Sequence, residues 1–180
     1  IEIVNIERTR SHVYADDLYS LGYGNGFEMA HNRLFQMDVL RNMARGEAAE
    51  LLDDRDQLSQ DMRTKRDLYD EAEITEMWAA APSDIRTLIQ GFTDGVNEKL
   101  QRMYDGDERT LPGEYMEIRD PPDWKPEDSV AIMAFLLGRF GVGGGDELGN
   151  AKSFARLEQN LGSTEDAFRA YGDLNWLGGP

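Results

Sequence analysis

The chain has 180 residues, with 35 acidic and 19 basic side chains and a formal net charge of -16. This charge argues against nucleic acid or an anionic membrane surface as a partner, because both require a basic face. The chain has no cysteine, which excludes disulfides, thiolate metal sites and cysteine nucleophiles on it. No run of about 18 apolar residues is present, so no transmembrane helix is predicted.

The acidic excess is dispersed along the chain, which indicates an acidic surface and not a disordered acidic tail. Two interpretations remain. The source is a salt-loving organism, in which high salt screens the self-repulsion, or the protein is an ordinary acidic one. The sequence opens at IEIVNIERTR without a methionine, so we expect a trimmed N-terminus.

The N-terminal segment predicts β structure. Apolar residues within 1–6 indicate a short strand, and residues 13–15 are a second candidate extended piece. An isolated strand is unstable in water. This strand therefore requires a partner, either from a later segment or from another chain.

A helix is predicted to follow GYGNG, which spans residues 22–26. Apolar residues then recur in steps of three and four, as on one face of an α-helix. They are Phe27, Ala30, Leu34, Met37, Leu40 and Ala44. We interpret the three alternating glycines as a tight junction that ends the extended segment. Gly46 interrupts the helix, and EAAELL adds another helical turn or two.

Further helices are predicted downstream. Residues 58–80 have a polar helical pattern, and Ser83 after Pro82 is a candidate N-cap. The clearest stripe contains Ile85, Leu88, Ile89, Phe92, Val96, Leu100 and Met103. Turn-forming residues predict a loop over 104–124. The next helix starts at Pro126, and its apolar core predicts that it is buried and ends at Gly138.

GVGGGDE breaks that helix, and two helical patterns close the chain, the second opened by STED at Ser163. The predicted fold is therefore α+β but mostly helical. Residues 1–180 are interpreted as a single region.

No complete catalytic site is evident from the residues. The candidate bases are His12 and His31, and His31 follows Ala30 on the apolar helix face, where a structural role is favoured. GYGNG has the spacing GxGxG instead of GxGxxG, so nucleotide binding is not expected. DGDERTLPGE, residues 105–114, lacks the ligand spacing of a calcium loop.

The segment GRFGVGGGDELGN, residues 138–150, is the more informative place. Arg139 and Phe140 lie at a predicted helix end, where they either contact a ligand or serve a salt bridge and the core. Asp146 and Glu147 either join a calcium site or stabilise the N-terminus of the next helix.

Three segments in order resemble the α subunit of penicillin acylases. They are HVYADDLYSLGYGNGFEMAHNRLFQMDVLRNMARGEAAELL, PSDIRTLIQGFTDGVNEKL and WKPEDSVAIMAFLLGRF. The resemblance covers nearly the whole chain. One departure is Asn32, where the family usually has aspartate, which we expect to weaken an ion pair with a neighbouring arginine.

The resemblance implies an N-terminal-nucleophile hydrolase with an αββα sandwich core, completed by a partner β chain. One precursor is exported and cuts itself, and the β chain then begins with the nucleophilic serine, whose α-amino group is the base. This α chain would therefore carry no catalytic residue and would not be an independent catalytic domain. A periplasmic or extracellular location follows, with the signal peptide already removed.

The resemblance also implies roles for a few residues. The family motif M-x-x-R-F at the acyl-binding pocket corresponds here to Leu136, Arg139 and Phe140. A structural Ca²⁺ shared with the β chain corresponds to Glu147, and ungapped counting from Phe140 would select Asp146 instead. No organic cofactor is expected.

The resulting hypothesis is an amidohydrolase that removes the acyl group of a β-lactam antibiotic or a similar small N-acyl compound. The alternatives are an acyl-homoserine-lactone acylase of the same fold, which would serve quorum quenching, and a non-catalytic helical scaffold module.

Overall fold

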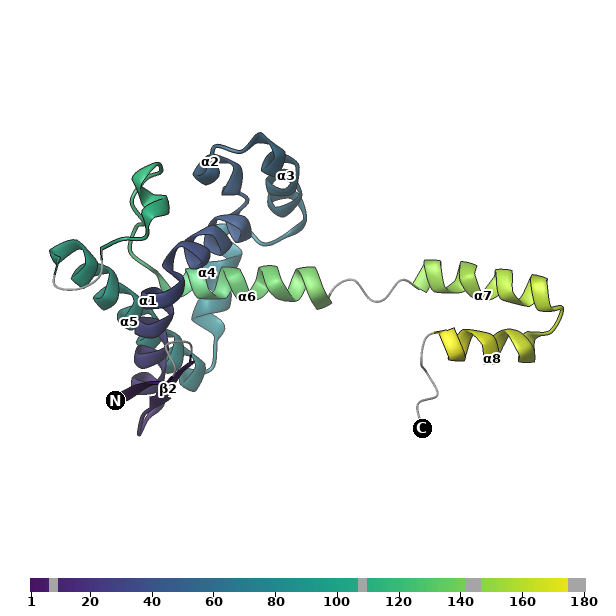
Figure 1. Cartoon of the computed structure of the whole chain (residues 1–180), viewed down its shortest axis with the longest axis horizontal. Coiled ribbons are helices and arrows are strands. Elements are labelled where there is room, and N and C mark those ends of the chain that lie inside the picture. Colours follow the sequence, from purple (N-terminus) through teal and green to yellow (C-terminus); the bar gives the residue numbers. More distant parts are fainter. Residues whose placement is uncertain (7–9, 107–109, 142–146, 175–180) are drawn as a thin grey trace. The chain divides into compact units, whose positions relative to one another are not determined.

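The computed structural model of the chain describes residues 1–6, 10–106, 110–141 and 147–174 (Figure 1). The chain divides into two compact units, Ile1–Leu137 and Gly138–Pro180. The described part is mostly helical, as predicted. The first unit contains β1 Glu2–Ile6, β2 Arg10–Tyr14, α1 Leu18–Arg45, α2 Ala48–Leu52, η1 Arg55–Gln57, α3 Leu58–Asp67, α4 Glu71–Ala80, α5 Ser83–Asp105, η2 Gly113–Met116 and most of α6 Pro126–Gly141.

The N-terminal strand finds its partner within the chain. Strands β1 and β2 form an antiparallel pair in which Ile3 faces Val13. A two-stranded hairpin is only marginally stable in water. Here it is tied to α1, because the Ser11 hydroxyl donates to the Glu28 carboxylate at 2.7 Å.

The glycines of GYGNG lie inside α1, so the predicted junction and helix start at Phe27 are wrong. The helix begins at Leu18, and the Asp17 carboxylate caps it by accepting from the Ser20 N–H at 2.7 Å. Glycine costs about 1 kcal/mol relative to alanine inside a helix, so sequence reasoning placed these residues outside it.

These glycines serve a close approach between α1 and α5. A Cβ atom on Gly22 or Gly26 would lie 2.1 Å from a backbone oxygen of α5. A Cβ atom on Gly91 or Gly95 would meet a backbone oxygen of α1 at the same 2.1 Å. The two helices therefore pack backbone against backbone. Gly24, between the other two, faces the hairpin instead.

A kink interrupts α1 at Arg33, whose φ of -141° and ψ of 19° are not helical. The Asn32 amide donates to the Glu28 carbonyl at 2.9 Å and to the Glu28 carboxylate at 3.1 Å. Insertion of a side chain into the backbone ladder is a recognised cause of a kink. The described partner of Asn32 is thus Glu28 and not an arginine, and an amide suits this place because aspartate would face another carboxylate.

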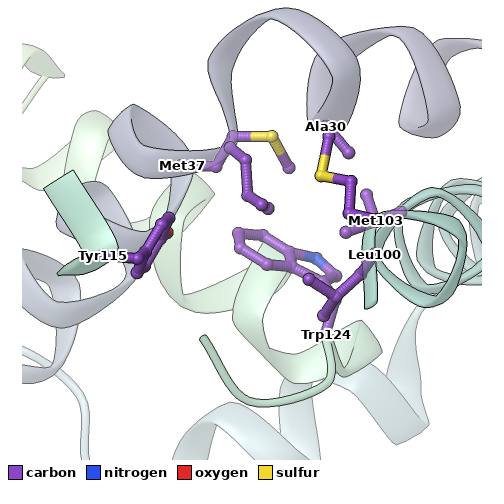
Figure 2. Packing of buried hydrophobic residues seen from close by; sticks show 8 residues of the cluster. Ala30, Met37, Leu100, Met103, Tyr115 and Trp124 are labelled. Carbon is purple, nitrogen blue, oxygen red and sulfur yellow. The ribbon is translucent and has the colours of Figure 1, made fainter. Parts of the chain in front are cut away.

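The main core lies between α1, α5 and the segment before α6. Its buried members are Ala30, Leu34, Met37, Val96, Leu100, Met103, Tyr115 and Trp124. Figure 2 shows the Trp124 ring beside Met37, Leu100 and Met103. The Trp124 indole N–H donates to the Ser129 hydroxyl at 3.0 Å. The predicted loop therefore supplies two aromatic residues to the core.

Two predicted helix boundaries need correction. The polar pattern over 58–80 is split into α3 and α4, and a capping box at Asp70 opens α4. Ser83 is the first residue of α5, and the N-cap position is held by Pro82, which makes no side-chain capping hydrogen bond. Gly46, by contrast, ends α1 as predicted, and its φ of 67° explains the glycine.

Helix α6 is buried on one face only, contrary to the prediction of a helix buried all round. Ala131 and Phe135 pack with Ala44 of α1 and Ile74 of α4. Met133 is 51% exposed and Leu137 is 67% exposed. The described part of this chain leaves that apolar face uncovered.

The second unit contains the end of α6 and a helical hairpin of α7 Glu147–Leu161 and α8 Thr164–Leu174. The Phe154 ring packs edge-on against Phe168 and Tyr171, with centroids 5.2 and 5.9 Å apart. Ser163 caps α8 as predicted, because its hydroxyl accepts from the Asp166 N–H at 3.3 Å. Among the described helices, none combines the length and the hydropathy that a membrane span requires.

Candidate functional site

The three predicted pocket residues lie on one helix. Helix α6 continues past its predicted end at Gly138 to Gly141. Leu136, Arg139 and Phe140 therefore have helical spacings of three and four, which place residues on neighbouring positions of one face. Leu136 is half-buried and packs against the buried cluster of Ala44, Ile74, Ala131 and Phe135. Arg139 is exposed.

The predicted calcium ligand has a defined place in the chain. Glu147 is the first residue of α7. Its side chain, that of Phe140 and all of Asp146 lie outside the described residues. Within the described residues no group of three or more His, Asp or Glu side chains is arranged to hold a metal ion.

The start of α6 is fixed by a buried carboxylate that sequence reasoning did not single out. Asp128 is the third residue of the helix, and its Oδ2 accepts from the Lys125 backbone N–H at 2.8 Å. The same carboxylate accepts from Arg41 at 3.3 Å and from Arg45 at 2.8 Å. The signal in the sequence is WKPED, in which proline starts a helix and an acid follows two residues later.

Arg41 is the centre of this polar network. It is 5% exposed and donates to the Asp38 carboxylate and to the carbonyls of Pro122 and Asp123, at 3.3 and 3.4 Å. Its guanidinium lies 4.9 Å from the centroid of the Trp124 ring. The sequence gives only a weak signal for the role of Arg41, because polar residues within an apolar helix stripe are common.

Asp38 supports Arg41 from within α1. It is 1% exposed and accepts from the Asn42 amide at 3.0 Å and from the Tyr115 hydroxyl at 3.4 Å. Burial, together with the negative charge of Asp38, raises the pKa of Tyr115 well above its usual range. Tyr115 therefore stays protonated and remains a hydrogen-bond donor.

Cavities border these helices. One of about 380 Å³ is bordered by the network, including Arg41, Arg45 and Asp128. Another, of about 680 Å³, runs from the α1 kink to residues 110–114, and His31 lines it. His12 is exposed on β2 and stacks on Tyr14, with centroids 6.4 Å apart.

Comparisons with known proteins extend over the whole chain. The family model for penicillin amidase matches residues 2–177. Penicillin G acylase of Escherichia coli is 28% identical over 181 residues, which cover 100% of this chain and 21% of that protein. Acyl-homoserine lactone acylase QuiP of Pseudomonas fluorescens (strain Pf0-1) is 32% identical over 131 residues, 70% of this chain and 14% of that protein.

A solved structure has the same fold. It is a thermostable penicillin G acylase from Alcaligenes faecalis, with a TM-score of 0.70 at 28% identity, and the match covers 99% of this chain and 92% of that chain. The chain thus spans only 21% of the length of the Escherichia coli relative. Because the family match includes almost every residue, the chain belongs to the penicillin amidase family, the penicillin acylases.

Proposed function

We propose that this chain is the α subunit of a penicillin-acylase-type amidohydrolase whose nucleophilic serine lies on a β chain. The observation that carries the proposal is the match to a solved penicillin G acylase chain, of which it covers 92%. The Escherichia coli relative is much longer, since the same match covers 21% of it. Both coverages are those expected of an α chain that is accompanied by a larger partner chain.

The exposed apolar surface supports a partner chain. Met133 and Leu137 are exposed on α6 of the first unit. In the second unit Leu148, Phe168 and Leu174 are 79%, 68% and 70% exposed. Such groups of exposed apolar side chains are typical of surfaces that another protein covers. We propose that the β subunit from the same precursor covers them and completes the αββα sandwich.

The proposed reaction is acyl transfer to water. The β-chain serine oxygen attacks the amide carbonyl carbon, and the serine α-amino group takes its proton and delivers it to the leaving amine. Hydrogen-bond donors of the β chain stabilise the oxyanion. Water then releases the acyl group as a carboxylic acid. On this chain, Leu136 and Phe140 would line the acyl pocket, and Arg139 would lie near the polar end of the substrate.

A second substrate class has support of its own. QuiP, an acyl-homoserine lactone acylase, is 32% identical over 131 residues. We propose N-acyl homoserine lactones as the alternative small-molecule substrates, because the apolar Leu136 suits an aliphatic chain as well as an aromatic one. A substrate panel on the assembled enzyme, comparing phenylacetyl and alkanoyl amides with N-acyl homoserine lactones, distinguishes the two.

The pocket assignment predicts that Leu136→Ala and Phe140→Ala change acyl preference. A lost apolar contact should alter the ratio of kcat/KM between phenylacetyl and octanoyl amides by about tenfold. The matched control is Met116→Ala, because Met116 is 88% exposed on η2 and is not part of the proposed pocket. An unchanged ratio in both pocket variants would refute the assignment.

The calcium proposal requires ligands from the partner chain. A carboxylate such as that of Glu147 is a ligand that Ca²⁺ prefers, but the ion takes about six to eight oxygen ligands. The described residues of this chain contain no group of three acidic or histidine side chains that could complete such a set. In this proposal the other ligands come from the β chain, and the bound ion would have a structural role.

Glu147→Ala is therefore expected to lower the calcium that the assembled enzyme retains after dialysis, because a charged ligand is lost. Metal analysis of the dialysed protein measures this, with Asp146→Ala as the comparison. Calcium loss only in the Asp146 variant would show that Asp146 is the ligand instead of Glu147. Full calcium retention in both variants would show that neither residue of this chain binds the ion.

The proposals on export and processing rest on the resemblance. We propose export of an autoproteolytically processed precursor to the periplasm or the cell exterior. A salt-loving source is proposed from the net charge of -16.

A further inference from the structure

We infer that Asp128 is a positioning residue for the acyl pocket. It binds two arginines of α1, and in this way it fixes the direction of the part of α6 that carries Leu136. The inference rests on the proposed function, because it concerns the same pocket. We assign Asp128 no contact with the substrate.

The contacts of Asp128 use both of its carboxylate oxygens. Its Oδ1 accepts from Arg45 Nη2 at 2.8 Å, and its Oδ2 accepts from Arg41 Nη1 at 3.3 Å and from the Lys125 backbone N–H at 2.8 Å. The Asp128 side chain is 5% exposed. The carboxylate that caps α6 is therefore also the one that attaches the helix to α1.

Arg45 extends the attachment to a third helix. Its Nη2 binds Asp128, while its Nη1 forms an ion pair with Glu71 in the first turn of α4. A planar guanidinium can hold two carboxylates at fixed directions at once, which an ammonium group does less well. Helices α1, α4 and α6 thus meet at one arginine.

These polar contacts restrain tilting of α6, which the apolar contacts of the helix restrain less well. Ala131 and Phe135 pack with Ala44 and Ile74, but apolar burial is non-directional and allows small shifts. Leu136 follows Asp128 by eight residues, or about 12 Å along the helix axis. A tilt of about 5° at Asp128 would move Leu136 by about 1 Å, and a displacement of that size can cost about 100-fold in rate.

The cavity beside the network is not a convincing anion site. It measures about 380 Å³ and is bordered by Arg41 and Arg45. The three nitrogens of Arg41 all donate to described groups, and both terminal nitrogens of Arg45 are paired with carboxylates. These guanidinium groups already have structural partners, which favours a positioning role over ligand binding.

The test compares two buried carboxylates that bind the same arginine. Asp128→Asn weakens the link between α1 and α6, whereas Asp38→Asn weakens contacts within α1 and with Tyr115 of η2, none of which involves α6. Each is made in the enzyme assembled with its proposed β chain. The readout is the ratio of kcat/KM for phenylacetyl and octanoyl amides, because a ratio is independent of the fraction of enzyme that folds.

We expect Asp128→Asn to change this ratio by about three- to tenfold and Asp38→Asn to change it by less than about twofold. Arg45→Lys should change the ratio in the same direction as Asp128→Asn, because one ammonium group cannot hold both Asp128 and Glu71 in the same geometry. If Asp128→Asn yields no folded enzyme, Arg45→Lys decides the question.

The experiment distinguishes failure of the positioning role from failure of the pocket assignment. A ratio that stays at the wild-type value in Asp128→Asn and Arg45→Lys, while Leu136→Ala still changes it, overturns the positioning role and leaves the proposed function intact. An equal change in Asp38→Asn also overturns it, because the network would then act as a general structural support. No change in either Leu136→Ala or Phe140→Ala removes the pocket assignment and this inference with it.

Discussion

Gly26→Ala is expected to destabilise the protein by about 3 kcal/mol or more, although alanine is the better helix former. The new Cβ atom would lie 2.1 Å from the Phe92 carbonyl oxygen and 2.8 Å from its carbonyl carbon. A backbone group cannot rotate away as a flexible side chain can. Helices α1 and α5 would therefore have to move apart, and the core around Leu100 and Met103 would open.

Thermal and denaturant unfolding of the assembled protein measures this effect. Gly172→Ala is the matched control, because Gly172 lies in helix α8 and its Cβ would meet no atom within 4 Å. We expect that variant to be neutral or more stable by up to about 1 kcal/mol. Gly91→Ala should destabilise the protein by a similar amount, because its new Cβ atom on α5 would lie 2.1 Å from the Tyr19 carbonyl oxygen of α1. Equal stability of Gly26→Ala and wild type would contradict the backbone contact.

Arg41→Met is the second large effect, with an expected loss of about 3–5 kcal/mol. Methionine replaces part of the side-chain volume but supplies no hydrogen-bond donor. Asp38 and Asp128 would remain buried without their shared guanidinium, and an uncompensated buried charge is costly. The stacking of the guanidinium on Trp124 is lost as well.

The same unfolding experiment tests Arg41→Met, and Arg169→Met is its control. Arg169 pairs with Glu165 on α8, but the two side chains are 73% and 78% exposed. An exposed pair of this kind contributes at most about 1 kcal/mol. A similar change in both variants would show that burial of the network adds little to stability.

Helix positions were predictable where local rules apply. The stripe from Ile85 to Met103 and the proline at position 126 correctly indicated α5 and the start of α6. Gly46 was predicted to interrupt the helix, and it ends α1 in the left-handed conformation that favours glycine. Such signals depend on residues within one or two turns of each other.

The start of α1 was not predictable from the same rules. Three glycines at alternate positions argue locally against a helix. Gly22 and Gly26 are explained only by the close approach of the α5 backbone, and Gly24 faces the hairpin. The face of α6 was misjudged for a related reason. Apolar residues all round predicted burial, yet Met133 and Leu137 have no cover from the described chain.

By itself the sequence determined the helix-rich composition, the order of the family motifs and the place of Leu136, Arg139 and Phe140 near one helix end. These are local properties of spacing and residue type. Only the tertiary structure decided that Asp128, 87 residues beyond Arg41, shares its charge with two arginines of α1. The physical reason is that a buried ion pair depends on which helices meet, and that is fixed by packing across the whole unit.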